Sequence, residues 1–216
     1  MGFHTFDPES ADRLEDESRY RYCSREELVG ALGLGSAREE SAAVGSGPDD
    51  KVTIADLGSG TGFYTDDVAP FAGEVEAVDV QDGMHELYRE KGVPENVELV
   101  TADIGDLPFD DGELEAAFST MTFHEFAGSG GEDDEGREMN TSTEADAGAE
   151  TEVARVLRDG GRFVAADWTA NGDGEGGPPV SERYDCDEAV ELLENAGFDI
   201  VRADERPETF LLIAER

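Results

Sequence analysis

The sequence predicts a doubly wound, Rossmann-like α/β fold, in which helices cover both faces of one seven-stranded sheet. Short apolar runs alternate with helical patterns along the chain, which is typical of a mostly parallel sheet. The first run ends in a turn with glycine at positions 58, 60 and 62. The last two runs are joined by a connection short enough for a hairpin, which predicts an antiparallel last strand.

Residues 1–50 are predicted to form a helical arm and a linker in front of a domain that covers 51–216. Ser24, with Glu27 three positions later, is a capping-box pattern and predicts a short helix over 25–33. The rest of the segment is rich in Gly, Ser, Ala and Glu, which is typical of a linker. The arm either packs against the domain or also covers its binding site as a lid.

The turn after the first strand is the strongest signal in the chain. Residues 52–57 are predicted to form a buried strand, because the run is short, rich in β-branched residues and ended by glycine. A helix predicted over 61–69 would present its N-terminal N–H groups to a ligand at the turn. A plain turn needs one glycine, whereas three at alternate positions let the backbone approach a ligand closely.

The remaining elements continue the alternation. The connection over 128–149 is too polar and too rich in glycine to bury a surface, so it is predicted to be a flexible acidic insertion. The other predicted strands cover 75–79, 96–102, 114–119, 162–168, 198–201 and 209–214. Two further helices are predicted over 81–90 and 150–157. A third begins at the capping pair Asp185 and Glu188 and ends before Gly197.

The charge of the chain is strongly negative, with 54 acidic and 16 basic residues and a net charge of −38. A disordered acidic protein is disfavoured, because 38% of the residues are hydrophobic and periodic segments are clear. The acidic residues are spread along the chain and do not form a tail. This pattern predicts a surface adapted to high salt, where ions screen the self-repulsion.

The composition also disfavours several classes of partner. No basic cluster is present, which argues against a nucleic-acid substrate. Cys23 and Cys186 are isolated and no His cluster accompanies them, so neither a metal site nor a disulfide framework is expected. No apolar run approaches 18 residues and the start lacks a signal pattern, so the expectation is a cytoplasmic protein without a membrane span. The oligomeric state stays open.

The run Asp56-Leu57-Gly58-Ser59-Gly60-Thr61-Gly62 resembles the first motif of the class I S-adenosylmethionine-dependent methyltransferases. It departs from the dinucleotide fingerprint G-x-G-x-x-G, because Phe63 stands where the third glycine is required. The segment from Leu157 to Trp168, a helix end followed by a Gly-Gly turn and an apolar strand, is also similar to this family. The resemblance covers about residues 52–216.

The resemblance implies a site for S-adenosylmethionine at the ends of the strands. Asp79 lies 23 residues after Asp56, near the spacing of a ribose-binding acid, although it could instead cap the next helix. Asp103 matches the acid that receives the adenine amino group in this family, although an Asx-turn would also explain it. The full implied set is Asp56, Gly58, Ser59, Gly60, Gly62, Asp79, Val80, Asp103, Ile104, Ser119 and Thr120.

His124 is the candidate catalytic residue, since the resembled family often carries a His at this position. It serves either as a general base or as a packed residue at a helix start. A tentative pocket for the methyl acceptor comprises aromatic and acidic side chains that could equally be core or surface: Phe6, Tyr20, Phe123, Glu125 and Trp168.

The resemblance therefore implies transfer of a methyl group from S-adenosylmethionine to a small-molecule acceptor by in-line displacement. Two alternatives stay open: a non-catalytic module that binds S-adenosylmethionine, and an NAD-dependent oxidoreductase, which Phe63 disfavours. The acceptor, and whether oxygen, nitrogen, sulfur or carbon is methylated, cannot be inferred from the sequence.

The charge generates a first testable prediction. The free energy of unfolding is expected to be higher in molar KCl than in dilute buffer, because the screening length falls from about 30 Å at 0.01 M salt to about 3 Å at 1 M. Denaturation by urea at several KCl concentrations measures it. Equal stability at low and high salt would contradict the salt-adapted surface.

Overall fold

The structure is a computed structural model that describes residues 13–34, 52–128 and 148–216. Three predictions fall wholly or largely outside these residues: the linker after Gly35, the side chain of Phe6, and the acidic insertion over 128–149. Among the described residues, no helix is both long and apolar enough to cross a membrane.

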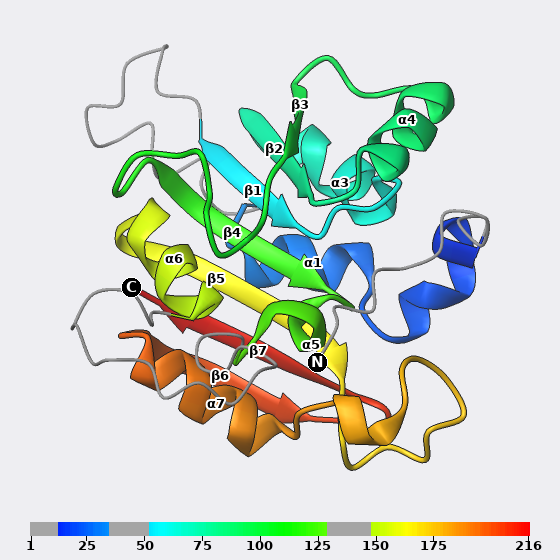
Figure 1. Ribbon diagram of the computed structural model, residues 1–216, viewed down its shortest axis with the longest axis vertical. Coiled ribbons are helices and arrows are strands. Elements are labelled where there is room, and N and C mark those ends of the chain that lie inside the picture. The colour runs from blue at the N-terminus through cyan, green and yellow to red at the C-terminus, as the bar shows by residue number, and fades with distance from the viewer. Residues whose placement is uncertain (1–12, 35–51, 129–147) are drawn as a thin grey trace, which may run out of the picture.

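Within the described residues, seven strands form one sheet in the order β3-β2-β1-β4-β5-β7-β6 (Figure 1). Strand β7 runs antiparallel to both of its neighbours, whereas the other neighbouring pairs are parallel. The predicted fold class is confirmed, including the antiparallel last strand. The strands are β1 (Thr53–Leu57), β2 (Glu74–Asp79), β3 (Val97–Thr101), β4 (Leu114–Thr120), β5 (Leu157–Trp168), β6 (Asp199–Glu205) and β7 (Thr209–Glu215).

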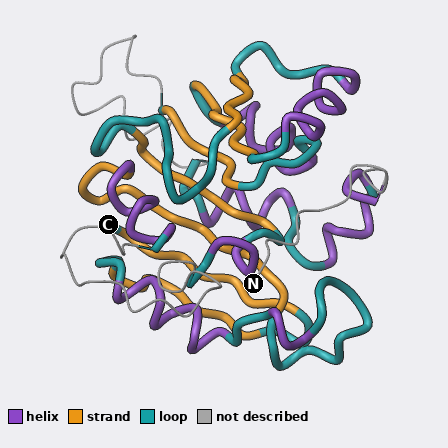
Figure 2. The backbone as a smooth tube through the Cα atoms, viewed as in Figure 1, coloured by secondary structure: helices purple, strands orange, loops and turns teal. Residues whose placement is uncertain are grey.

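Helices cover both faces of the sheet, and Figure 2 shows them in purple on either side of the strands. One face carries α1 (Arg25–Ala31) and α3 (Phe63–Val68), with α4 (Asp82–Lys91) beside α3. The other face carries α5 (Phe123–Phe126), α6 (Ala149–Val156) and α7 (Cys186–Asn195). Short 3₁₀ turns complete the helical elements: η2 (Glu17–Arg21), η4 (Ala69–Phe71) and η5 (Val180–Glu182).

The central strands β1, β4 and β7 are mainly apolar because both of their faces are covered. Successive side chains of a strand point to opposite faces. Accordingly, Ile54 lies in the core under α1 and α3, and Ala55 lies in the core under α6 and α7. Phe118 and Ala117 of β4 divide between the two cores in the same way. These continuous apolar runs are what marked the strands in the sequence.

The element boundaries differ from the prediction mainly at β5. This strand begins at Leu157, five residues before the predicted start at Arg162. The pairing with β4 shifts register between Leu114 and Ala116, so the intervening residues of β5 form a bulge that includes the Gly-Gly pair. Backbone hydrogen bonds between this bulge and Arg216 hold it in the sheet, which is why it does not form a free turn.

The turn between β1 and α3 adopts the left-handed backbone that its glycines permit. The φ angles of Gly58, Gly60 and Gly62 are +82°, +53° and +81°. An added Cβ at Gly62 would lie 2.1 Å from the ring of Tyr88 on α4. The Tyr88 hydroxyl donates a hydrogen bond to Asp66 of α3 at 2.6 Å, so the ring is fixed under the turn.

This contact generates a matched pair of stability predictions. Gly160→Ala, at a left-handed glycine with open space around it (φ +71°), should cost about 1–2 kcal/mol through backbone strain alone. Gly62→Ala should cost about 1–3 kcal/mol more, because the new methyl group collides with Tyr88. Urea denaturation in molar KCl compares the two variants. Equal losses would mean that the ring does not restrict the turn.

Candidate active site

The site is built where the carboxyl ends of four adjacent strands meet. In open α/β sheets, ligands bind beyond these ends at the point where the strand order reverses. Here that point lies between β1 and β4, and the arrowheads of both strands point toward the N-terminal arm in Figure 1. Acidic residues stand at or near three of the four ends: Asp56 on β1, Asp79 on β2 and Asp167 on β5.

Asp79, the last residue of β2, is hydrogen-bonded to the glycine turn. One carboxylate oxygen accepts from Gly60 N at 2.8 Å, and the other accepts from Gln81 N at 2.8 Å. A carboxylate oxygen can accept more than one hydrogen bond, so each retains capacity for a ligand hydroxyl. The neighbouring Val80 is 55% exposed, which leaves an apolar side chain open beside the acid.

Asp56 is fully buried at the end of β1. Thr65 donates to its Oδ2 at 2.6 Å, while Oδ1 has no partner among the described residues. Burial raises the pKa of Asp56 to about 7; the Thr65 hydrogen bond opposes this rise and the charge of Asp79 adds to it. The buried hydroxyls of Ser59 and Ser119 also lack partners within the described part of the chain. Three predicted site residues at or just after the ends of β1 and β4 therefore have unpaired polar atoms.

Asp103 and Ile104 follow β3, two strands away from β1. Asp103 is exposed and accepts from Gly105 N at 2.8 Å, which is the Asx-turn that the sequence offered as its alternative role. Ile104 is half-buried against the core. Thr120, at the end of β4, is buried, and its carbonyl accepts from the Thr122 hydroxyl at 3.3 Å.

The turn from β4 into α5 is packed directly on the glycine turn. Thr122 occupies the space that a Cβ at Gly58 would need, and its hydroxyl also donates to Gly58 O at 3.4 Å. Met121 has a left-handed backbone (φ 61°), and its N–H donates to Ala166 O on β5 at 2.8 Å. A non-glycine residue in this conformation is strained, and such strain is concentrated at functional sites.

His124 on α5 is held by Asp167 of β5. Asp167 is fully buried and accepts from His124 N at 2.7 Å, and it also contacts His124 Nδ1 at 2.9 Å. Burial lowers the pKa of His124, but the charge and hydrogen bond of Asp167, with smaller contributions from Glu125 and Glu182, outweigh it and raise the pKa above its ordinary value. Burial also raises the pKa of Glu125 to about 7.

The partnership with Asp167 was not predicted from the sequence. The signal was present, because Asp167 follows an apolar strand as Asp56 and Asp79 do. A pattern along the chain does not show, however, that this acid meets a histidine 43 positions earlier.

The N-terminal arm lies over the glycine turn. Leu14 Cδ1 would be 3.4 Å from a Cβ at Gly60, and Glu15 accepts a hydrogen bond from the Thr61 hydroxyl and pairs with Lys91 at 3.2 Å. The Arg19 guanidinium stacks 5.0 Å from the rings of Phe63 and Tyr64. Burial lowers the pKa of Arg19, while the charges of Asp56 and Glu15 act in the opposite direction. The arm thus brings a cation close to the strand ends.

The aromatic residues predicted to line the acceptor pocket fall into two groups. Phe123 is fully buried against Phe126, Tyr184 and Phe210, so the structure places it in the core. Tyr20 packs on Phe63 at 4.9 Å, with its ring half-exposed at the arm.

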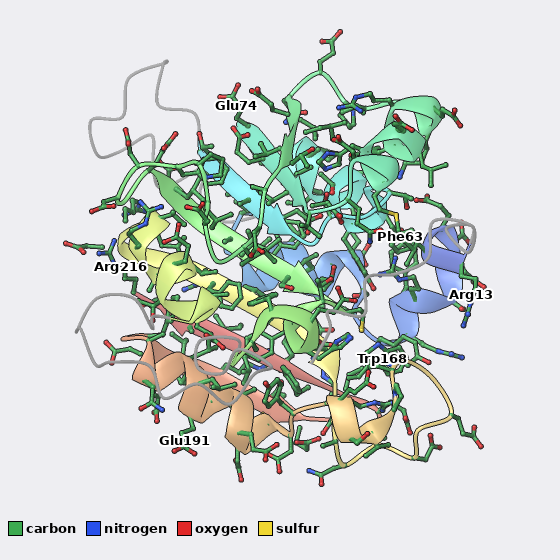
Figure 3. The ribbon with its side chains drawn as sticks, viewed as in Figure 1. Arg13, Phe63, Glu74, Trp168, Glu191 and Arg216 are labelled. Carbon is green, nitrogen blue, oxygen red and sulfur yellow. The ribbon has the colours of Figure 1, made fainter. Side chains whose placement is uncertain are left out.

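Trp168 is half-exposed and stacks against Tyr22 of the arm at 4.5 Å. Figure 3 labels Phe63 and Trp168 on the side of the molecule that carries Arg13, the first residue of the described arm.

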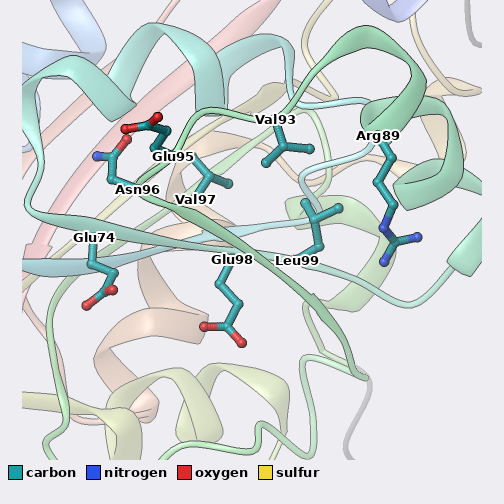
Figure 4. A pocket seen from close by; sticks show the side chains of 8 residues that line it. All are labelled: Glu74, Arg89, Val93, Glu95, Asn96, Val97, Glu98 and Leu99. Carbon is teal, nitrogen blue, oxygen red and sulfur yellow. The ribbon is translucent and has the colours of Figure 1, made fainter.

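An open depression of about 460 Å³ lies elsewhere, along the edge strand β3 (Figure 4). It includes Glu74 and Val97, which are the first residues of β2 and β3. It therefore lies at the amino ends of these strands, away from Asp56 and Asp79, and is not part of the site. The other residues lining it are Arg89, Val93, Glu95, Asn96, Glu98 and Leu99.

The chain resembles known methyltransferases in sequence and in structure. The profile of a family described as "Methyltransferase domain" matches residues 55–165. A demethylmenaquinone methyltransferase of Clavibacter sepedonicus is 32% identical over 128 residues, which are 59% of this chain and 42% of that protein. The biotin biosynthesis bifunctional protein BioHC of Cellvibrio japonicus (strain Ueda107) is 35% identical over 72 residues, which are 33% of this chain and 14% of that protein. The matches therefore span less than half the length of each of these two relatives.

The fold is shared along nearly the whole chain with solved methyltransferase structures. A SAM-dependent methyltransferase from Aquifex aeolicus superposes with a TM-score of 0.74 at 26% sequence identity. The superposition covers 98% of this chain and 99% of that chain.

The raised pKa of Asp56 predicts a pH dependence of stability. Between the ordinary carboxyl pKa and about pH 7, the folded state binds a proton that the unfolded state has released, so stability falls as the pH rises. Asp56→Asn keeps the shape and lacks this titration. The free energy of unfolding of Asp56→Asn, relative to that of wild type, should therefore rise between pH 4 and pH 8 by roughly 2–4 kcal/mol.

Urea denaturation in molar KCl across this pH range measures the difference. Asp199→Asn, at an exposed position on β6, is the control and should show no such change. A constant difference between Asp56→Asn and wild type would contradict the shifted pKa.

Proposed function

The chain belongs to the methyltransferase domain family, and from this we propose that it transfers a methyl group from S-adenosylmethionine to a small-molecule acceptor. The observation that carries the proposal is that three buried polar atoms, on Asp56, Ser59 and Ser119 at or just after the ends of β1 and β4, lack partners among the described residues. Buried polar groups are normally hydrogen-bonded, so a polar ligand at this place would complete them.

The residues present fit such a methyl donor. Asp79 retains hydrogen-bonding capacity for two ribose hydroxyls, and the exposed Val80 would pack against an adenine ring. Arg19 supplies a cation near the strand ends for the carboxylate of the donor. Asp56, whose Oδ1 is unpaired, would accept a hydrogen bond from the donor's ammonium group.

The donor supplies, when bound, a methyl group that is already activated on a sulfonium. The protein's task is therefore mainly to position the acceptor and to exclude water, and positioning of this kind can supply roughly 7–11 kcal/mol of the barrier. The arm residues Leu14 and Glu15 cover the glycine turn and would separate the site from solvent. His124 would take a proton from the acceptor.

A small-molecule acceptor is supported by the charge around His124. The groups whose charges act on His124 are Asp167, Glu125 and Glu182, all of them acidic. Such surroundings repel a polyanion such as a nucleic acid and accept a neutral or cationic compound. The Clavibacter sepedonicus relative is named for a small-molecule substrate, which agrees with this class.

We also propose that the surface is adapted to high salt and that residues 13–34 act as a lid. The net charge of −38 supports the first proposal, and the contacts of Leu14, Glu15 and Tyr22 with both sides of the site support the second.

Titration with S-adenosylhomocysteine tests the proposed function. By isothermal titration calorimetry in molar KCl, the intact protein should bind this compound with micromolar affinity and should not bind NADH. Gly60→Arg should abolish binding, because the new side chain would fill the turn where the backbone faces Asp79.

Gly92→Arg is the matched control. Gly92 also has a positive φ angle (+107°), but it has open space around it at the end of α4. This variant should bind as wild type does. A wild-type protein that binds no S-adenosylhomocysteine at high salt, or that prefers NADH, would refute the proposed function.

A further inference from the structure

Asp167 receives more hydrogen bonds than a residue that only fills the core requires. Its Oδ2 accepts from His124 N at 2.7 Å, and its Oδ1 accepts from Trp168 N at 2.6 Å. In addition, both carboxylate oxygens of Asp167 lie within 3.0 Å of His124 Nδ1. The two backbone bonds fix the start of α5 and the end of β5, so the carboxylate is held rigidly and the imidazole is held by it.

This arrangement determines which nitrogen of His124 carries the hydrogen. A carboxylate can only accept, so Nδ1 must be the donor. In the neutral imidazole, the lone pair then lies on Nε2. Nε2 is 3.9 Å from Glu125 Oε1, which is longer than a hydrogen bond, and no hydrogen bond to another described residue engages it.

The imidazole also lies next to the predicted donor site. Thr122, two residues before His124, packs on Gly58 of the glycine turn. The charge of Asp79 acts on Glu125, the residue after His124. The His124 side chain is 11% exposed, so it is nearly enclosed but still accessible.

We infer that Asp167 is a positioning residue, which holds His124 in the tautomer whose Nε2 lone pair accepts a proton from the methyl acceptor. The inference rests on the proposed function and deepens it. An acceptor oxygen or nitrogen forms a bond to the methyl carbon, the carbon–sulfur bond breaks with its electron pair passing to sulfur, and the acceptor's proton passes to Nε2.

The electrostatics around His124 agree with this role. Burial alone would lower its pKa, and Asp167, followed by Glu125 and Glu182, reverses that effect. These acids lie on β5, α5 and η5 and stabilise the imidazolium that forms when the proton arrives.

Asp167→Asn separates positioning from a purely structural role. The amide oxygen can still accept a backbone N–H, so the support of α5 is largely retained. The amide nitrogen is a donor, however, and if it faces Nδ1, the imidazole must move its hydrogen to Nε2. A structural role alone would not change the tautomer.

The experiment is ¹H–¹⁵N NMR of the full chain labelled with ¹⁵N-histidine, in molar KCl, which needs no acceptor. The chain has three histidines, and the signals lost in His124→Gln identify His124. The wild type should show the Nδ1–H tautomer and a pKa above the ordinary value of 6.5. Asp167→Asn should show the Nε2–H tautomer and a pKa lower by about one unit or more. Asp159→Asn, exposed on the same strand, should change neither.

An Nε2–H tautomer in the wild type, or an unchanged tautomer together with an unchanged His124 pKa in Asp167→Asn, would overturn the inference. The wild-type spectrum is decisive even if Asp167→Asn does not fold. Calorimetry with S-adenosylhomocysteine on the same samples separates the two hypotheses. Normal binding with the wrong tautomer refutes only the inference, whereas the expected tautomer without binding refutes the proposed function.

Discussion

The structure depends on one constraint: the backbone between β1 and α3 must approach its neighbours more closely than side chains would allow. Thr122 fills the space beside Gly58, the Tyr88 ring fills the space beside Gly62, and Asp79 accepts from Gly60 N. The turn therefore connects β1, β2, α4 and α5 at one point. Asp79 is anchored to this turn directly, and His124 is positioned near it through Thr122, two residues earlier.

The fold could be predicted from the sequence because its signals are local. Apolar runs such as Thr53–Leu57 predict strands covered on both faces, and the capping box of Asp185 and Glu188 marks the start of α7, as the structure confirms. The start of β5 could not be predicted, because the Gly-Gly pair that suggests a turn is held in the sheet by Arg216, more than fifty residues later. The same limit applies to the site. Acids at strand ends can be read from a pattern, whereas the contact of Asp167 with His124 depends on the order of the strands.

The acidic residues of this chain fall into an exposed group and an enclosed group, and dissolved ions screen the two groups to different extents. Most of the acids among the described residues are exposed to solvent, where salt screens them. Asp56 and Glu125 are largely enclosed, and burial raises the pKa of each to about 7. Screening by ions is much weaker for enclosed groups. The protonation of the site is therefore set by the fold and stays nearly independent of the ionic strength.

The arm has a consequence for the rate at which a ligand can be exchanged. Leu14 covers Gly60, and the contacts that hold this part of the arm include the ion pair of Glu15 with Lys91, which is partly exposed at both ends. With the arm as the proposed lid, a compound that reaches the glycine turn would first displace Leu14, so opening of the arm would limit both its arrival and its departure. Exposed ion pairs weaken as the salt concentration rises. In concentrated salt the proposed lid would consequently open more readily and the residence time of a bound compound would shorten, although the same salt would stabilise the proposed salt-adapted surface.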